Sequence, residues 1–226
     1  MDRLKVWNII DLKKEYKLFG TIWVFKGKKN HSNQVIEQKA HLCAQGFRQT
    51  LGVDFDKTYA PTGRLNSLRA LIAHACLNKL DFHHIDIKNA FLNAPLNKTV
   101  YLKIPQGLAI DCQQYCLHLE KAIYDLKEPP RAWYTRLQKW LQNAGFVTCK
   151  LDPCIFHRNN PEKVWIYVHV DDNAIFGKNL HIFKKEIDND FEIKDMGPSN
   201  LLLGVKISQL EEGIGMDQQH FFESLL

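Results

Sequence analysis

The chain has 226 residues, of which 45% are hydrophobic and 24% charged, as is usual for a globular protein with a buried core. No apolar run approaches the roughly 20 residues of a membrane span, and the charged N-terminus has no apolar signal-peptide segment. The net charge of +5 is weak support for a polyanionic partner, and the six scattered cysteines are expected to be reduced.

The first elements in the chain predict a β-hairpin. Residues 21–26, TIWVFK, are rich in β-branched and aromatic side chains and predict a strand. Residues 27–33, GKKNHSN, have the composition of a turn, and residues 34–44 predict the returning strand.

A helix and a short strand follow. Residues 67–80 place apolar side chains at helical spacing, and Asn66 is the expected N-cap of that helix. Residues 82–87, FHHIDI, predict a strand that carries Asp86 close to its end.

The next segment predicts an amphipathic helix. Pro130 suits its first turn and Gly145 its C-terminal cap. One apolar face would carry Trp133, Leu137, Trp140 and Leu141.

The last third of the chain alternates strands with one helix. Residues 164–170, VWIYVHV, and 174–177, AIFG, predict two strands, with Asp171, Asp172 and Asn173 as the hairpin turn between them. A helix is expected over 180–191 and a further strand over 201–208. Strands and helices mix without regular βαβ alternation, which predicts an α+β fold.

Two acidic sites stand out, namely Asp86 and the pair Asp171 and Asp172. Carboxylates that meet at strand ends repel each other unless a cation is present, and their oxygens suit Mg²⁺. Two such ions about 3.5–4 Å apart can clamp both oxygens of a phosphoryl transfer. The competing interpretation is that Asp-Asp-Asn is only a favourable turn sequence.

Five blocks of the sequence resemble one known family. VHVDDNAIFG resembles the YVDD box of reverse transcriptases, and residues 84–107, HIDIKNAFLNAPLNKTVYLKIPQG, resemble the segment around the first catalytic aspartate of copia-type elements. KAHLCAQGFRQTLGVDFDKTYAPT over 39–62, IYDLKEPPRAWY over 123–134 and LLLGVKI resemble three further blocks in the same order. The chain is thus identified as a member of the copia-type (Ty1/copia) retrotransposon reverse transcriptases, as a fingers and palm part of the Pol polyprotein.

The resemblance implies a right-hand polymerase fold and an RNA-directed DNA polymerase. It would add deoxynucleotides to a primer 3′-end on an RNA or DNA template with two Mg²⁺ ions, or with Mn²⁺. Asp86, Asp171 and Asp172 would be the catalytic metal ligands, joined by the backbone carbonyl of Ile87.

Other positions take roles by the same resemblance. Phe91 would stack under the sugar and exclude a 2′-hydroxyl, and Lys39, His41 and Glu128 would lie at the nucleotide. Leu203, Gly204 and Val205 would lie at the primer terminus. Packing in the core remains the alternative for Phe91, and a solvated lysine the alternative for Lys39.

The resemblance also implies how the chain is divided into fingers, palm and thumb. Fingers are expected over about 1–82 and part of 106–150, palm over about 83–105 and 151–210, and the start of a thumb connection over 211–226, with the thumb largely missing. The partners would be a primed template, deoxynucleoside triphosphates and the other Pol segments, RNase H and integrase, with no membrane. The location would be cytoplasmic virus-like particles with later nuclear entry.

Four residues depart from the family pattern. His41 replaces an arginine, His169 a tyrosine, Asp125 a glycine and Glu128 a glutamine. A neutral imidazole and an added carboxylate both weaken contacts with a triphosphate. One alternative function is therefore a catalytically inactive, truncated remnant that keeps the fold and binds nucleic acid. Another is a different two-metal enzyme such as a nuclease.

Overall fold

The computed structural model of the chain describes residues 5–29, 35–219 and 222. The chain divides into two compact units, each with its own sheets and core. Unit 1 comprises Met1–Ala60 and Phe91–Arg136, and unit 2 comprises Pro61–Ala90 and Leu137–Leu226. Residues 65–77, predicted for the fingers, belong to unit 2, while residues 91–105, predicted for the palm, belong to unit 1. The fingers and palm boundaries stay a prediction.

Unit 1 is built on a four-stranded sheet in the order β1-β7-β6-β2. Its strands are β1 (Trp7–Asp11), β7 (Tyr115–Leu119), β6 (Tyr101–Leu102) and β2 (Leu18–Phe19). Unit 1 also contains a short 3-10 helix at Gly46–Arg48 and most of a second one at Ala90–Asn93. The buried core beside this sheet consists of Val6, Phe19, Ala44, Leu92, Val100, Leu102, Leu117, Leu119, Ile123 and Leu126.

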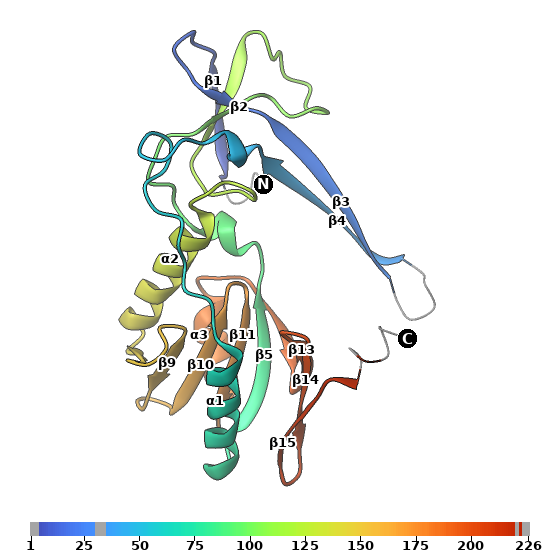
Figure 1. The fold of residues 1–226 in the computed structure, drawn as a ribbon, viewed down its shortest axis with the longest axis vertical. Coiled ribbons are helices and arrows are strands. Elements are labelled where there is room, and N and C mark those ends of the chain that lie inside the picture. The colour runs from blue at the N-terminus through green and yellow to red at the C-terminus, as the bar shows by residue number, and fades with distance from the viewer. Residues whose placement is uncertain (1–4, 30–34, 220–221, 223–226) are drawn as a thin grey trace. The chain divides into compact units, whose positions relative to one another are not determined.

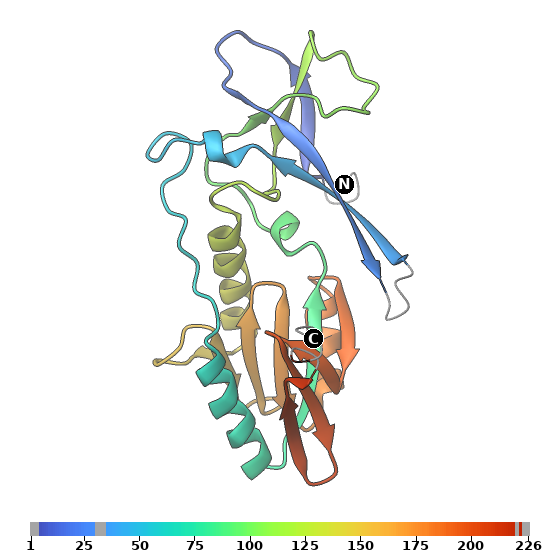
Figure 2. The same ribbon diagram turned by 45° about the vertical axis from the view of Figure 1, so that its right-hand side comes forward.

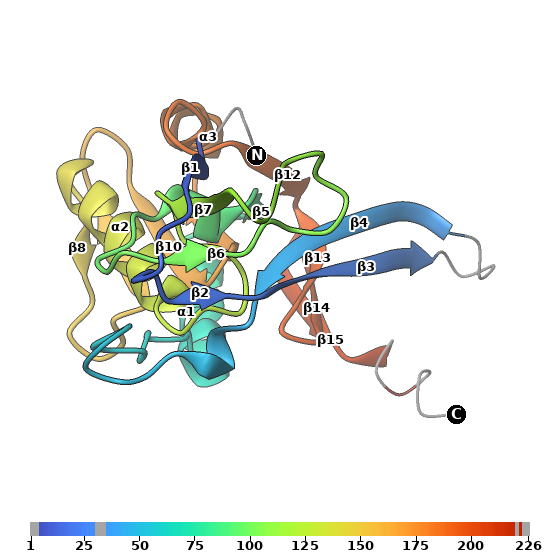
Figure 3. The same cartoon turned by 90° about the horizontal axis from the view of Figure 1, so that it is seen from above.

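The predicted N-terminal hairpin is confirmed. Strands β3 (Thr21–Lys29) and β4 (Val35–Ala44) pair antiparallel with Trp23 opposite Leu42, and the expected turn lies largely outside the described residues. Figure 3 shows the pair as a long ribbon that leaves the rest of unit 1. Phe25 is 76% exposed, since β3 and β4 form a two-stranded sheet of their own.

Unit 2 is built on a six-stranded sheet in the order β12-β5-β11-β10-β9-β8. Its strands β5, β11, β10 and β9 are labelled in Figure 1. Its strands are β5 (Asp81–Ile87), β8 (Val147–Thr148), β9 (Ile155–Arg158), β10 (Val164–His169), β11 (Asp172–Gly177) and β12 (Ile193–Gly197). The continuous apolar run of β10 fits its central place, because a strand buried on both faces needs no polar alternation.

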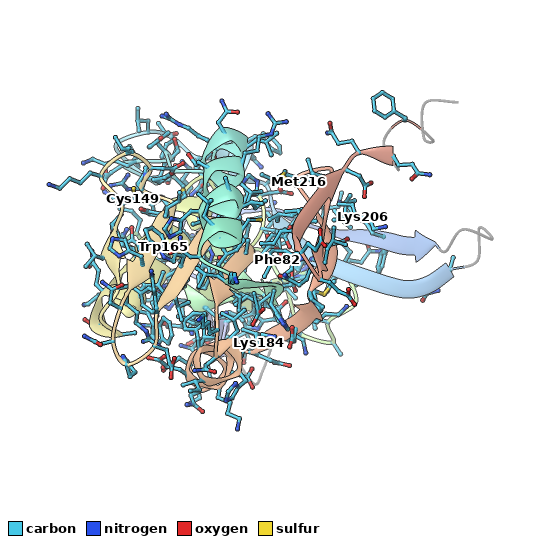
Figure 4. All side chains as sticks on the ribbon, turned by 90° about the horizontal axis from the view of Figure 1, so that it is seen from below. Phe82, Cys149, Trp165, Lys184, Lys206 and Met216 are labelled. Atoms are coloured by element: carbon cyan, nitrogen blue, oxygen red, sulfur yellow. The ribbon has the colours of Figure 1, made fainter. Side chains whose placement is uncertain are left out.

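The two faces of this sheet are covered by different elements. Helix α1 (Leu65–Leu77) and the three-stranded sheet β13 (Ser199–Leu202), β14 (Val205–Leu210) and β15 (Gly213–Asp217) pack on one face, around Phe82, Tyr167 and Phe176. Helix α3 (Leu180–Asp188) lies on the other face. In the end-on view of Figure 4, α1 and α3 stand on opposite sides of the sheet, and Lys184 marks α3.

The helices match the predicted segments, with changes at their ends. Helix α2 (Pro129–Asn143) buries Trp133, Leu137 and Leu141 as expected, whereas Trp140 of the predicted face is only half-buried. Asn66 is not an N-cap, because α1 already begins at Leu65 and Arg64 takes the cap position without a side-chain bond. The third helix ends at Asp188 rather than 191.

The strand predicted over 201–208 is instead a hairpin. Leu203 and Gly204 both adopt left-handed backbone conformations, with φ of 53° and 74°, and the chain reverses there between β13 and β14. Apolar composition alone could not reveal this break. The mixture of helices and largely antiparallel sheets confirms the α+β fold class. None of the helices in the described parts of the chain has the length and apolar character needed to cross a membrane.

Candidate active site

The acidic residues predicted from sequence come together at one end of the unit 2 sheet. Strands β5 and β11 run antiparallel, with Asp86 directly opposite Asp172. Asp171 lies in the adjoining loop, where its carbonyl oxygen accepts a bond of 2.9 Å from the Ile87 amide. In Figure 2 the loop between β10 and β11 stands beside the end of β5. Antiparallel pairing thus places three carboxyl groups on neighbouring backbone positions.

The loop itself is shorter than predicted. Val170 and Asp171 form the two-residue connection, while Asp172 and Asn173 already belong to β11. Asn173 is only 2% exposed, and its side-chain amide donates to the Asp171 carbonyl at 2.8 Å. The Asp171 carbonyl thus accepts hydrogen bonds from the Ile87 amide and from the Asn173 side chain. Asn173, a residue of β11, therefore stabilises the loop that precedes it.

The electrostatics of the site disfavour three ionised carboxylates without a counter-charge. Burial raises the pKa of the Asp171 carboxyl, although a bond to the residue's own amide opposes the rise. The negative charges of Asp172 and Asp86 raise that pKa further. The three acids therefore lie within electrostatic reach of one another.

Asp172 has a further partner that sequence reasoning missed. The imidazole of His84 lies with its Nε2 3.1 Å from Oδ1 of Asp172, and His84 is 3% exposed. The clue in the sequence was the position of His84, two residues before Asp86, which puts both side chains on one face of a strand.

The donor set fits Mg²⁺ chemically, because it offers only hard oxygen ligands whose mutual repulsion a divalent cation would relieve. In the described parts of the chain, no three His, Cys, Asp or Glu side chains are gathered into a group able to hold a metal ion. The role of the Ile87 carbonyl stays a prediction.

The nucleotide-binding candidates all belong to unit 1. His41 and Phe91 contact the same ring, that of Tyr124, edge-on with centroid distances of 4.8 Å and 5.1 Å. Lys39 lies on β4 opposite Lys26, but its side chain lies outside the described part of the structure.

Glu128, by contrast, is buried. It is 6% exposed, and its Oε1 lies 3.5 Å from the backbone nitrogen of Asp56. The residue stands immediately before α2, and its carbonyl accepts a bond from the Ala132 amide in the first turn. This packing gives Glu128 a structural role in unit 1.

A family comparison decides the identity of the chain. Residues 4–226 match the model of the family described as reverse transcriptase (RNA-dependent DNA polymerase). The chain belongs to this reverse transcriptase family. The identification made from the sequence blocks is thereby confirmed.

The relatives are Pol polyproteins of copia-type elements. The chain is 28% identical to the Retrovirus-related Pol polyprotein from transposon TNT 1-94 of Nicotiana tabacum, over 97% of this chain and 17% of that protein. It is 31% identical to that from transposon RE1 of Arabidopsis thaliana, over 92% and 15%, and 24% identical to the Transposon Ty1-GR1 Gag-Pol polyprotein of Saccharomyces cerevisiae, over 92% and 12%. The chain thus spans less than a fifth of each relative's length.

A solved structure, that of the foamy viral protease-reverse transcriptase in complex with double-stranded DNA, aligns with a TM-score of 0.48 at 13% identity. The alignment covers 95% of this chain and 33% of the other.

The residues of this reverse transcriptase domain predicted for the primer side form the tip of the β13–β14 hairpin. Leu203 and Gly204 make the turn, while Val205 is 2% exposed and packs in the unit 2 core. Their contact with a primer stays a prediction.

Proposed function

We propose that this domain catalyses RNA-directed DNA synthesis, adding deoxynucleotides to the 3′-end of a primer. The observation that supports this activity best is the register that sets Asp86 opposite Asp172, with Asp171 in the adjoining loop. Two-metal polymerisation needs carboxylates from separate strands at one place, and these two strand ends bring them there.

Asp86, Asp171 and Asp172 would hold two Mg²⁺ ions, with the Ile87 carbonyl as a further ligand. The bound ions would supply the charge that activates the primer hydroxyl and neutralises the leaving pyrophosphate. The protein contributes the placement of the ligands. The Asp171 carbonyl is bonded by both Ile87 and Asn173, so the loop carries its carboxylate on a fixed backbone.

The partners would be a primed template and deoxynucleoside triphosphates. The net charge of +5 supports a polyanionic ligand, and Phe91 would exclude a 2′-hydroxyl at the sugar. In a longer Pol polyprotein of the kind its relatives form, the domain would act beside the other Pol segments, in cytoplasmic particles.

One observation favours the alternative of a catalytically inactive remnant that keeps the fold and binds nucleic acid. Glu128 brings a carboxylate where the family carries a neutral glutamine, and this carboxylate is buried against the Asp56 backbone.

Primer extension separates the two functions. The substrate is poly(rA)/oligo(dT) with Mg²⁺ and dTTP, and wild type is compared with the Asp171→Asn, Asp172→Asn double variant. Asp81→Asn is the matched control, because Asp81 lies on the same strand as Asp86 but opposite Gly177, at the far end of the sheet register.

Extension by wild type and Asp81→Asn that vanishes in the double variant would establish the polymerase. No extension by a folded wild type, at high protein and high dTTP, would favour the inactive remnant. Reverting His41→Arg and Glu128→Gln would then test the nucleotide contacts, since recovery of extension in that variant would assign the loss to these residues.

A further inference from the structure

A histidine lies directly beside the acids of the proposed metal site. Strand β5 alternates its side chains between the two faces of the sheet, so Phe82, His84 and Asp86 share one face. The register with β11 sets His84 opposite Ala174 and Asp86 opposite Asp172, which makes His84 and Asp172 diagonal neighbours on that face.

The contact between them has the geometry of a hydrogen bond. His84 Nε2 and Asp172 Oδ1 are 3.1 Å apart. The imidazole is 3% exposed, whereas the Asp172 side chain is 43% exposed. The histidine is therefore held by the protein core, and the carboxylate it contacts reaches solvent.

The environment of the imidazole selects one tautomer. Nδ1 of His84 is buried and has no hydrogen-bond partner among the described residues. A proton on Nδ1 would be left buried without an acceptor, whereas a proton on Nε2 is donated to Asp172. A ring proton on Nε2 is therefore the one that has an acceptor, namely Oδ1 of Asp172.

We infer that His84 is a positioning residue that fixes the Asp172 carboxylate through its Nε2–H and leaves Oδ2 of Asp172 for a divalent cation. The inference rests on the proposed function, because it gives His84 a role toward the same metal site. Without a partner, the half-exposed Asp172 side chain could rotate. The hydrogen bond from the buried His84 ring removes that freedom before a metal ion binds.

His84 acts through Asp172 and is not itself a ligand in this arrangement. Its ring nitrogen that faces the site carries the proton of the bond, so it has no lone pair for a metal ion. Hydrogen-bond donors that orient carboxylate ligands typically change metal affinity by about 10- to 100-fold when they are removed.

The test measures Mn²⁺ binding by electron paramagnetic resonance, without nucleotide or nucleic acid. His84→Phe fills a similar volume without a donor, and His84→Gln restores an N–H at a similar reach. The matched control is His83→Phe. His83 is the neighbouring residue on the opposite face and contacts Lys184 instead. Thermal melting checks that each variant is folded.

The expected result is an affinity for Mn²⁺ about tenfold weaker in His84→Phe and within twofold of wild type in His84→Gln and His83→Phe. In the Asp172→Asn background, His84→Phe should bring no further loss, because the histidine acts through that carboxylate. Equal Mn²⁺ affinity in wild type and His84→Phe would overturn this inference and leave the proposed function standing.

A second measurement needs no metal. In ¹⁵N-histidine NMR spectra of the metal-free protein, the Nε2–H of His84 should give a ring N–H signal protected from exchange, which disappears in Asp172→Ala. The absence of that signal in wild type would overturn the inference whatever the protein does with metal. A wild type that shows the signal but binds no Mn²⁺ would overturn the metal site of the proposed function, and the positioning role with it.

Discussion

At the scale of single residues, the loop between β10 and β11 is held in a strained conformation. Val170 has a φ of 61°, in the left-handed region that β-branched residues rarely occupy. A two-residue connection between antiparallel strands requires positive φ in this loop, and the bonded carbonyl of Asp171 fixes it there. The strain lies next to the three acids, as is common at functional sites.

Replacing Val170 with glycine should therefore stabilise the protein. The strain of about 1–2 kcal/mol is relieved, while the unfolded chain gains roughly 0.5–1 kcal/mol of conformational entropy. The expected rise in the free energy of unfolding is about 0.5–1 kcal/mol, measured by urea denaturation. Val168→Gly is the control, since Val168 is 2% exposed in regular strand and its loss should cost about 2–4 kcal/mol. A lower free energy of unfolding in Val170→Gly than in wild type would show that the backbone at Val170 is not strained.

The cysteines should differ widely in reactivity. Burial, together with the neighbouring Asp125 carboxylate, raises the pKa of the Cys43 thiol to about 11. At pH 8 only about one Cys43 in a thousand is a thiolate, the form that reacts. Iodoacetamide at pH 8 should modify the exposed Cys112 and spare Cys43, as read by mass spectrometry of peptides. Both should react in urea, and fast native labelling of Cys43 would argue against its burial.

At the scale of elements, a partly buried ion pair joins three parts of unit 2. Arg158 on β9 makes two parallel bonds to Glu186 on α3, at 2.9 Å and 2.5 Å, and one to the carbonyl of Ala144 after α2. Its guanidinium also lies 4.6 Å from the ring centroid of Phe146. The Arg158 side chain is 2% exposed, so it depends on these partners to offset its desolvation.

Removing the carboxylate should therefore be costly. Glu186→Ala leaves the Arg158 charge buried without its partner, and we expect the free energy of unfolding to fall by about 2–4 kcal/mol in urea titrations. Lys185→Ala, an exposed neighbour on the same helix, should change it by less than about 0.5 kcal/mol. The double variant Arg158→Met, Glu186→Leu should recover part of the lost free energy of unfolding. If Glu186→Ala and Lys185→Ala lower this free energy by similar amounts, the ion pair contributes nothing to stability.

At the scale of the whole molecule, the excess of 30 Lys and Arg over 25 Asp and Glu should govern binding to a primed template. We expect the affinity for poly(rA)/oligo(dT), followed by fluorescence anisotropy, to fall as salt rises, with a log–log slope of roughly −0.9 for each phosphate contacted. The Asp171→Asn, Asp172→Asn variant should bind at least as tightly, since it loses two negative charges. Binding insensitive to salt would contradict an electrostatic interface.

Several local features could be predicted from the sequence alone. The β3–β4 hairpin, the apolar strand β10 and the amphipathic helix α2 follow from periodicity and turn composition, which act over a few residues. The ordered blocks were likewise sufficient to establish the family. The break at Leu203 and Gly204 did not follow from the apolar pattern, because leucine is rare in the left-handed conformation that it adopts there, although LLLGVKI resembles a hairpin block of the family.

The sequence by itself therefore determined the family and the fold class and singled out the three candidate acids, since these depend on local patterns and on residue identity. Only the tertiary structure decided that Asp86 faces Asp172 and that His84 reaches the Asp172 carboxylate. Alternation along a strand tells which side chains share a face, but not which strand lies beside it. That choice depends on packing between residues far apart in the chain, such as Leu68 of α1 in one buried cluster with Phe82 of β5 and Phe176 of β11.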